Sequence, residues 1–186
     1  YLVTAMQENA VHGWRIRDKT NMAMAGYPTK VKSFAWVGET PFLVTSGADE
    51  AICWPFDGKC GPMERSPVCL GKYNNIMVTQ VQSLPRENAV FAGYRDGSVL
   101  LAEINENNSG ILIRGSTGAE VTALPVSSTG SHIFIGDDDC SNTCRVCFLE
   151  GGSLLRCKTC SLVVHVKCSK LETLPDGDWN CSACQG

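Results

Sequence analysis

Residues 44–54 decide how the first part of this chain folds, and they read Val44-Thr45-Ser46-Gly47-Ala48-Asp49-Glu50-Ala51-Ile52-Cys53-Trp54. The β-branched and aromatic residues near both ends favour extended backbone, and the Gly-Ala-Asp-Glu centre favours a tight turn. The stretch therefore predicts a strand, an acidic turn and a second strand.

The same pattern recurs along residues 1–139. Matching turns stand at Glu8-Asn9-Ala10-Val11, Asp49-Glu50-Ala51-Ile52 and Asp96-Gly97-Ser98-Val99, at offsets of 41 and 47 residues, and Gly136-Asp137-Asp138-Asp139 follows Gly93-Tyr94-Arg95-Asp96 at 43. Short apolar or alternating runs between turn residues occupy residues 1–5, 10–16, 31–36, 42–46, 51–56, 77–84, 89–92, 98–104, 110–114, 121–125 and 132–135. Because no long helical period interrupts them, the segment is predicted to be all-β.

This repeat resembles the blades of a WD40-type β-propeller. It departs from that family's pattern where Arg15 and Pro55 follow tryptophans in place of aspartate, and where Tyr27 follows Gly26 in place of histidine. The strand count predicts a partial propeller, with two full blades near residues 31–73 and 77–115 and a partial blade on either side. Closure of the ring is what removes strand edges, so we expect this segment to belong to a larger propeller or to pair its edges with another chain.

The last part of the chain, residues 140–186, is dominated by metal-ligand residues. They form the pattern C-x2-C-x9-C-x2-C-x4-H-x2-C-x12-C-x2-C, at Cys144, Cys147, Cys157, Cys160, His165, Cys168, Cys181 and Cys184. A C-x2-C pair places two soft donors on one turn of backbone, so four pairs can hold two closed tetrahedral zinc sites. So short a segment needs such support to fold, and two structural zinc ions are the predicted cofactors.

The order of the ligands, four Cys, one His and three Cys, resembles the PHD finger, with Trp179 at that family's core tryptophan position. A RING finger places its histidine fourth, which disfavours a ubiquitin ligase. The resemblance implies a cross-braced finger, in which the first and third ligand pairs hold one zinc and the second and fourth pairs hold the other.

The same resemblance implies that an extended peptide, the N-terminal tail of histone H3 in the family, adds as a strand beside the second ligand pair. The predicted peptide-binding residues are Gly152, Ser153, Leu154, Leu155 and Arg156 on that edge, with Pro175 and Gly177 in the segment that captures the peptide's amino group.

Several side chains depart from the family's lysine readers. Val163 stands where an aromatic cage would place tryptophan, which argues against recognition of trimethyl-lysine. Ser153 and Lys158 replace acids, and Lys158 with Arg156 would repel a basic tail. Other acids, at positions 137–139 and 150, could serve a cationic peptide, although a solvated turn explains the aspartates as well. A basic cluster of Arg156, Lys158, Lys167 and Lys170 would instead favour an acidic partner.

The junction between the two parts is abrupt. The repeat predicts a glycine after Asp139, as Gly97 follows Asp96, but the sequence has Cys140 there. No Pro/Ser/Gly linker separates the two parts. Two interpretations stay open: a natural fusion in which residues 143–148 supply the missing strand, or unrelated pieces joined in one chain. The missing linker favours the second.

Composition limits the function. The net charge of −3 argues against nucleic acid as the main partner, and no run approaches the roughly twenty apolar residues of a membrane span. Dense cysteine that includes a histidine in its pattern indicates metal in a reducing, intracellular compartment. Cys53, Cys60, Cys69, His12 and His132 have no partners at ligand spacing. No phosphate loop or nucleophile motif is present, so no catalytic residues are predicted.

Two hypotheses follow. The first is a non-enzymatic, chromatin-associated protein of the nucleus that recognises a histone tail or similar peptide. The second is a scaffold of propeller and finger without histone binding.

Overall fold

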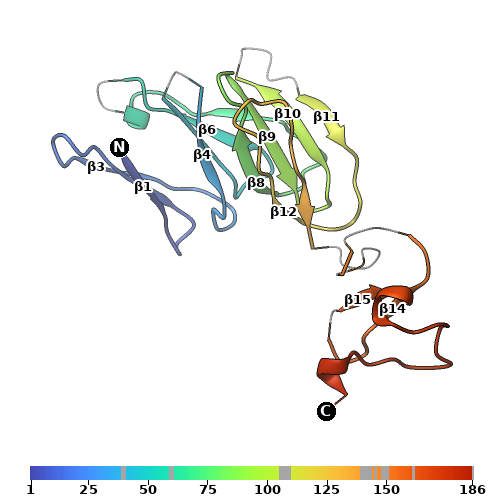
Figure 1. Ribbon diagram of the computed structural model, residues 1–186. Helices are drawn as coiled ribbons and strands as arrows, with labels where there is room; N and C mark the ends of the chain where they lie inside the picture. Colours follow the sequence, from blue (N-terminus) through green and yellow to red (C-terminus); the bar gives the residue numbers. More distant parts are fainter. Residues whose placement is uncertain are drawn as a thin grey trace. The chain divides into compact units, whose positions relative to one another are not determined.

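The computed structural model describes residues 1–38, 41–58, 61–104, 110–138, 144, 146–147, 151–160 and 162–185. The chain divides into two compact units, Tyr1–Asp138 (unit 1) and Asp139–Gly186 (unit 2) (Figure 1). The predicted junction at residues 139 and 140 lies outside the described residues. Each unit is described by itself.

Unit 1 consists of antiparallel sheets whose strands follow one another in chain order. Sheet A contains β1 (Leu2–Ala5), β2 (Val11–Trp14) and β3 (Asn21–Met24). Sheet B contains β4 (Phe34–Val37), β5 (Phe42–Thr45), β6 (Ala51–Pro55) and β7 (Val68–Leu70), with the 3-10 turn η1 (Gly61–Met63) between its last two strands. Sheet C contains β8 (Val78–Ser83), β9 (Ala89–Tyr94), β10 (Val99–Glu103) and β11 (Gly110–Arg114), and sheet D contains β12 (Val121–Ala123) and β13 (Gly136–Asp137). The predicted mainly β fold, with two four-stranded blades flanked by partial ones, is confirmed.

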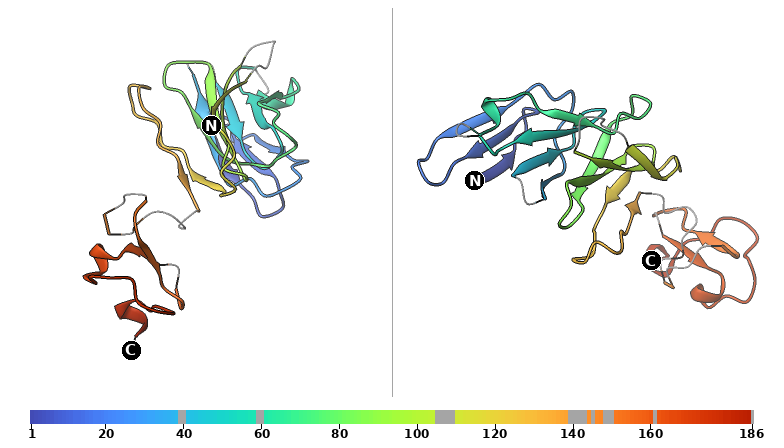
Figure 2. Two further views of the ribbon diagram at one scale, coloured as in Figure 1. Left: turned by 90° about the vertical axis from the view of Figure 1, so that its right-hand side faces the viewer. Right: turned by 90° about the horizontal axis from the view of Figure 1, so that it is seen from above.

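The sheets of unit 1 pack face to face and follow one another in chain order (Figure 2). One buried cluster joins sheets A and B around Val11 and Leu43, and a second joins sheets B and C around Val44 and Val90. A third cluster joins sheets C and D. All six residues of β9 are buried, because this strand is covered on both faces. Apolar burial between blades is therefore the main stabilising contribution in unit 1.

Close packing of sheet D on sheet C depends on Gly93 in β9. A Cβ atom at this position would lie 2.6 Å from Cγ1 of Val121 and 2.9 Å from Cδ1 of Leu124. Since real Cβ atoms do not approach other carbons so closely, the position requires glycine.

Tyr27, which stands where the WD40 pattern has histidine, is part of a hydrogen-bonded network. Trp54 Nε1 donates to the hydroxyl of Tyr27 at 2.6 Å, and that hydroxyl lies 2.7 Å from Thr45 Oγ1. Thr45 Oγ1 in turn donates to the Ile52 carbonyl at 3.2 Å. Burial raises the pKa of Tyr27, which keeps it a neutral donor. Tyr27 thus ties the loop before β4 to β5 and β6.

Three strands differ from the sequence prediction. β3 and β7 were not among the predicted runs, and the final strand is β13, at residues 136–137, where a run at 132–135 was expected. In that region Ile133 forms an isolated bridge with Val126. β3 alternates exposed Asn21 and Ala23 with buried Met22 and Met24, so pairing with β2 outweighs its weak strand propensity.

β11 is the outermost strand of sheet C and is apolar as well as exposed (Figure 1). Ile111, Leu112 and Ile113 are 66, 50 and 44% exposed. Such an edge can pair with another strand, which agrees with the expectation that this segment associates through its edges.

Unit 2 contains one small hairpin and short turns. β14 (Leu154–Arg156) pairs with β15 (Val163–His165), and the 3-10 turns η2 (Lys167–Ser169) and η3 (Ser182–Cys184) follow. None of the helices in the described part of the chain has the length and apolar character that a membrane crossing needs.

Candidate metal centres and peptide-binding edge

Four of the predicted metal ligands meet where β15 ends. Cys144, Cys147, His165 and Cys168 place one donor atom each within 4.8 Å of one another. The Nδ1 atom of His165 lies 3.2 Å from Cys147 Sγ and 4.0 Å from Cys168 Sγ. The backbone N–H of His165 donates to Cys144 Sγ at 3.2 Å. These residues form site 1.

The orientation of the His165 ring suits a metal ligand. Its Nε2 atom lies 2.5 Å from the carbonyl oxygen of Gly151. A carbonyl oxygen can only accept, so Nε2 donates to it, and the other ring nitrogen, Nδ1, faces the sulfurs. Gly151 therefore orients the imidazole from the side opposite the cluster.

The other four predicted ligands form site 2. Cys157, Cys160, Cys181 and Cys184 also lie with their sulfurs within 4.8 Å of one another. Cys160 Sγ lies 3.8 Å from Cys181 Sγ, and the Cys181 N–H donates to Cys157 Sγ at 3.4 Å. All cysteines in the described ranges are free thiols, so no disulfide is present among them.

Both sets of donors fit a tetrahedral zinc ion. Zn–S bonds of about 2.3 Å place two sulfurs about 3.8 Å apart in a tetrahedron, which matches the distance from Cys160 to Cys181. For a sulfur and an imidazole nitrogen the expected separation is about 3.6 Å, and the two distances from His165 Nδ1 bracket this value. The donor chemistry and spacing therefore allow a metal ion at each site.

Local electrostatics at both sites favour binding of a cation. Burial raises the pKa of Cys144, but N–H donation from Cys147 and His165 outweighs it and lowers the pKa to about 6. Backbone donation from Cys181 likewise lowers the pKa of Cys157 to about 6.

The last thiol of each site shifts the opposite way. Burial and the neighbouring thiols Cys144 and Cys147 raise the pKa of Cys168 to about 11, and the thiols Cys181 and Cys160 raise that of Cys184 to about 12. The three thiolates of site 1 and the four of site 2 would repel one another without a positive charge, which a bound metal ion would supply.

The apolar core of unit 2 is too small to position these ligands alone. The buried apolar residues in its described part are four aliphatic side chains and three ligand cysteines: Leu155, Val163, Val164, Val166, Cys144, Cys157 and Cys181. Cys157 directly follows β14, while His165 ends β15, so one hairpin carries ligands of both sites.

The predicted peptide edge is the outer side of β14. Val166 N–H donates to the Ser153 carbonyl and Cys157 N–H donates to the Leu162 carbonyl, which gives the phase of the hydrogen bonds with β15. Because these bonds alternate along an antiparallel pair, the backbone groups of Leu154 and Arg156 point away from β15. Among the described residues, β15 is the sole neighbour of β14 in its sheet.

Trp179 marks one end of this edge. Its carbonyl accepts the N–H of Lys158 at 2.9 Å, and Trp179 forms an isolated parallel bridge with Cys157. The Lys158 ammonium also forms an ion pair with Asp178. Lys158 therefore contributes less repulsion toward a cationic peptide than its sequence position indicates, since Asp178 offsets its charge.

A pocket of about 650 Å³ marks the other end of the edge. Gly152, Ser153, His165, Val166, Lys167, Cys168, Glu172, Thr173 and Leu174 line it. Leu174 lines this pocket at one end of β14, and the Trp179 carbonyl accepts from Lys158 at the other end. The segment from Leu174 to Trp179 therefore reaches both ends of β14. Pro175 and Gly177 lie on this exposed segment, outside the pocket lining, and Gly177 has a φ of +106°.

The residues that sequence reasoning missed are Glu172, Thr173 and the carbonyl of Gly151, whereas Leu174 and Asp178 are the ends of the segment that the family resemblance assigns to capture of the peptide's amino group. No spacing rule singles out the first three, because each reaches the site through folding of a loop.

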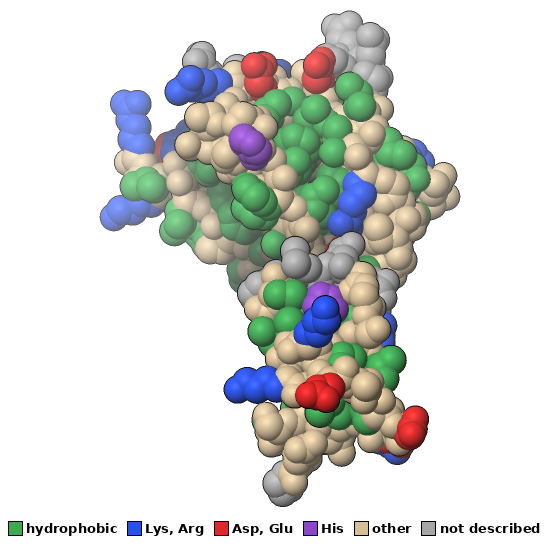
Figure 3. All heavy atoms as spheres, turned by 45° about the vertical axis from the view of Figure 1, so that its right-hand side comes forward, with side chains coloured by type: hydrophobic (Ala, Val, Ile, Leu, Met, Phe, Trp, Pro, Cys, Tyr) green, Lys and Arg blue, Asp and Glu red, His purple; other side chains and the backbone are tan. Residues whose placement is uncertain are grey.

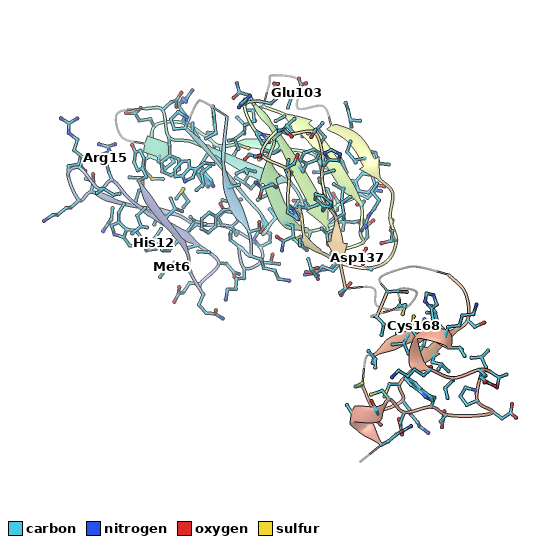
Figure 4. All side chains as sticks on the ribbon, in the orientation of Figure 1. Met6, His12, Arg15, Glu103, Asp137 and Cys168 are labelled. Atoms are coloured by element: carbon cyan, nitrogen blue, oxygen red, sulfur yellow. The ribbon has the colours of Figure 1, made fainter. Side chains whose placement is uncertain are left out.

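The remaining candidates are placed as follows. Asp137 ends β13 within unit 1 (Figure 4) and pairs with Arg114 at 3.0 Å. Cys53 is buried in β6, and burial raises its pKa to about 12; Cys69 is partly buried in β7. His12 lies on β2 beside Trp14, and the His132 ring contacts the hydroxyl of Ser131. Asp139, Cys60, Cys140 and Glu150 lie outside the described residues.

Fold and site together define a class of protein: a partial WD40-like β-propeller joined to a small unit with two Cys/His groups that could hold metal ions. The crystal structure of the RRP9 WD40 repeats has a TM-score of 0.54 and 18% identity to this chain, covering 73% of it and 43% of the RRP9 chain. The structure of U3-55K gives the same TM-score and identity, with 73 and 44% coverage.

A chain of the crystal structure of the Mitotic Checkpoint Complex matches with a TM-score of 0.57 and 15% identity, covering 74% of this chain and 42% of the other. These likenesses establish the fold of the matched part, and the chain spans less than half the length of these solved chains.

A short segment also resembles a plant protein. Increased DNA methylation 1 of Arabidopsis thaliana is 40% identical over 48 residues, which are 26% of this chain and 4% of that protein. No protein-family model matches the chain.

Proposed function

We propose that unit 2 is a zinc finger that binds an extended peptide as an added strand on β14, within a non-enzymatic protein of the nucleus. The observation that carries this proposal is the outer edge of β14, where the backbone groups of Leu154 and Arg156 point away from β15. Hydrogen bonds to such an edge supply affinity, and the flanking side chains supply specificity.

Zinc is the proposed ion at both sites. Cys144, Cys147, His165 and Cys168 would hold the first ion, and Cys157, Cys160, Cys181 and Cys184 the second. Since protein donors fill four positions at each site, the ions would stabilise the fold rather than activate water.

A histone H3 tail is the candidate peptide. It is supported by the PHD-like order of ligands and by the Pro175-x-Gly177-x-Trp179 segment. Propeller blades are also interaction surfaces, so a scaffold without histone binding is the second candidate, favoured by the exposed apolar edge of β11.

Calorimetry of the full chain loaded with zinc, against unmodified and methylated H3 tail peptides, tests the proposal. For a peptide that binds, single N-methylation of each backbone nitrogen in turn should weaken binding at alternate positions, because only every second N–H of an added strand faces β14.

Uniform effects of N-methylation would contradict strand addition. Dissociation constants above about 1 mM for every peptide, at two zinc ions per chain, would favour the scaffold.

A further inference from the structure

We infer that unit 2 has a second binding site, a groove lined by Val146, Leu171 and Trp179 that binds an acidic, apolar segment of a partner protein. We call it the second groove. The inference goes beyond the proposed strand addition, because it concerns another face of unit 2. It needs unit 2 to be folded but does not need a peptide on β14.

The second groove lies on the opposite face of the β14–β15 hairpin from the pocket beside Gly152. Val164 lines the groove, whereas the next residue of β15, His165, lines that pocket. Neighbouring residues of a strand project to opposite faces of its sheet. Among the described residues, Cys168 alone lines both. The two sites can therefore take separate partners.

The size of the second groove suits a ligand. Its volume is about 480 Å³, and ligand sites in proteins commonly measure about 300–1,000 Å³. Cys168 of site 1 and Cys181 of site 2 both line it. Closing both ligand sets would therefore fix its walls, so the groove belongs to the fold of unit 2 as a whole and not to the hairpin alone.

Apolar side chains dominate one part of the second groove. Val146 and Leu171 are 58 and 38% exposed. Leu162 and Trp179 line the same groove and pack against the core cluster of unit 2, which holds them in place. An apolar side chain that covers these residues would remove their surface from water, and this burial would favour binding.

The charge of the second groove favours an acidic ligand. Lys170 is exposed in its lining, and no Asp or Glu is among the described lining residues. Lys170 has no ion-pair partner among the described residues, whereas Lys158 is paired with Asp178. Figure 3 shows side chains of both signs on the surface of unit 2. The second groove differs from such mixed surface because its described lining carries a single cation.

A protein segment fits this lining better than a nucleic acid does. Nucleic acids bind mainly through several Lys and Arg contacts to successive phosphates, and the described lining offers one lysine. A segment with aliphatic or aromatic side chains next to one carboxylate matches both the apolar residues and Lys170. This is the ligand that the second groove is inferred to bind.

A positional scan tests the inference. The host peptide is Ac-Gly-Ser-Gly-Phe-Leu-Gly-Ser-Gly-NH2, in which Asp or Asn replaces each Gly or Ser in turn; acetylation removes the amino group that the 174–178 segment would capture. NMR titration of the zinc-loaded full chain would follow binding. We expect Asp to bind about three times more tightly than Asn at one or two positions. Replacing Phe-Leu by Ala-Ala should weaken binding about ten-fold.

The amide signals of the chain locate the bound peptide. Those of Leu171 and Ser182, which line the second groove, should shift most during the titration. Those of Gly152 and Thr173, which line the other pocket, should shift little. The H3 tail, where it binds, should bind at the same time as the acidic peptide, because the two sites lie on opposite faces.

Two pairs of matched variants make the test specific. Lys170→Gln should abolish the preference for Asp, while Lys167→Gln, in the pocket beside Gly152, should leave it unchanged. Leu171→Ser should weaken binding at least about five-fold, while Leu174→Ser, also an exposed leucine but in the other pocket, should not. All four variants keep the eight metal ligands, and two bound zinc ions per chain verify that unit 2 is folded.

Three results would overturn the inference. Absence of binding by every Asp peptide, with unit 2 folded, would reject the second groove as a site. Equal losses in the variants of Lys167 and Leu174 would assign binding to the pocket beside Gly152. Tighter binding of a short oligothymidine, with shifts at the same signals, would replace the protein segment by a nucleic acid. Each result is independent of whether the H3 tail binds, so failure of the strand-addition proposal is recognised separately.

Discussion

Unit 1 and unit 2 reach a stable fold by different physical routes. Unit 1 buries apolar side chains in three clusters between stacked sheets, with residues such as Leu43 and Val90 fully excluded from solvent. In unit 2 the buried cluster contains four residues, one of them the ligand Cys144. The difference indicates that hydrophobic burial suffices where sheets stack, and it supports the proposal that a unit of about 48 residues needs bonds to metal as well.

The largest effect should come from removing the metal. Chelation, or Cys157→Ser, should unfold unit 2 while leaving unit 1 folded, because metal binding contributes about 10 kcal/mol or more per site in modules this small. Metal analysis together with amide NMR spectra would resolve the two units. The matched control is Cys69→Ser, which replaces a partly buried thiol in β7 that is not a predicted ligand. Dispersed unit 2 signals that persist in metal-free protein would contradict the dependence.

Truncation of a core side chain in unit 1 should destabilise unit 1 and leave unit 2 unaffected. Leu43→Ala removes a side chain with no exposed area and should cost unit 1 about 2–5 kcal/mol. Leu2→Ala, at 56% exposure, should cost much less. Urea unfolding followed by circular dichroism would measure both. Release of zinc at the same urea concentration in the Leu43 variant and in the parent protein would verify that unit 2 is unaffected.

The Tyr27 network should contribute a smaller amount. Tyr27→Phe leaves the indole N–H of partly buried Trp54 and the hydroxyl of buried Thr45 without this partner, which should cost about 1–2 kcal/mol. Thr45→Val should cost a similar amount alone. Since the two hydroxyls share one hydrogen bond, the double variant should lose less than the sum. Strict additivity would show that the bond does not stabilise unit 1.

The exposed edge of β11 should affect association more than folding. Leu112→Lys, on a strand at the edge of sheet C, should reduce self-association while changing the unfolding free energy by about 0.5 kcal/mol or less. Sedimentation velocity at several concentrations would measure this. Thr122→Lys, an exposed residue of β12, is the control for added charge. Identical concentration dependence in both variants would argue against pairing through β11.

Local turn chemistry accounts for the part of the fold that the sequence predicts. At Asp96-Gly97, the Asp96 carboxylate accepts bonds from the N–H and hydroxyl of Ser98, so the turn between β9 and β10 is encoded within three residues. β3 and β7 lack such signals. Val68–Leu70 is short and follows Pro67, and its place in sheet B depends on pairing with β6. Only the tertiary fold identifies these strands.

The candidate site also has a part that local sequence predicts and a part that depends on the tertiary fold. Ligand pairs with two intervening residues are local, so spacing alone groups them, and the folded chain brings the eight residues together in two sets. The ion pair between Lys158 and Asp178 joins residues 20 positions apart in the chain. The pocket likewise joins Gly152 to Leu174. Such contacts depend on how the loop after η2 folds back, which no short pattern encodes.

The alternating order of the ligand pairs has a consequence for how unit 2 would take up two metal ions. Site 1 spans Cys144 to Cys168 and site 2 spans Cys157 to Cys184, so each set encloses part of the other. When one site binds its ion, the chain loop that the other site must close becomes shorter. The entropic cost of closing that second loop is therefore lower. The second ion should therefore bind more readily than the first, and a population given one ion per chain should separate into doubly loaded and empty molecules.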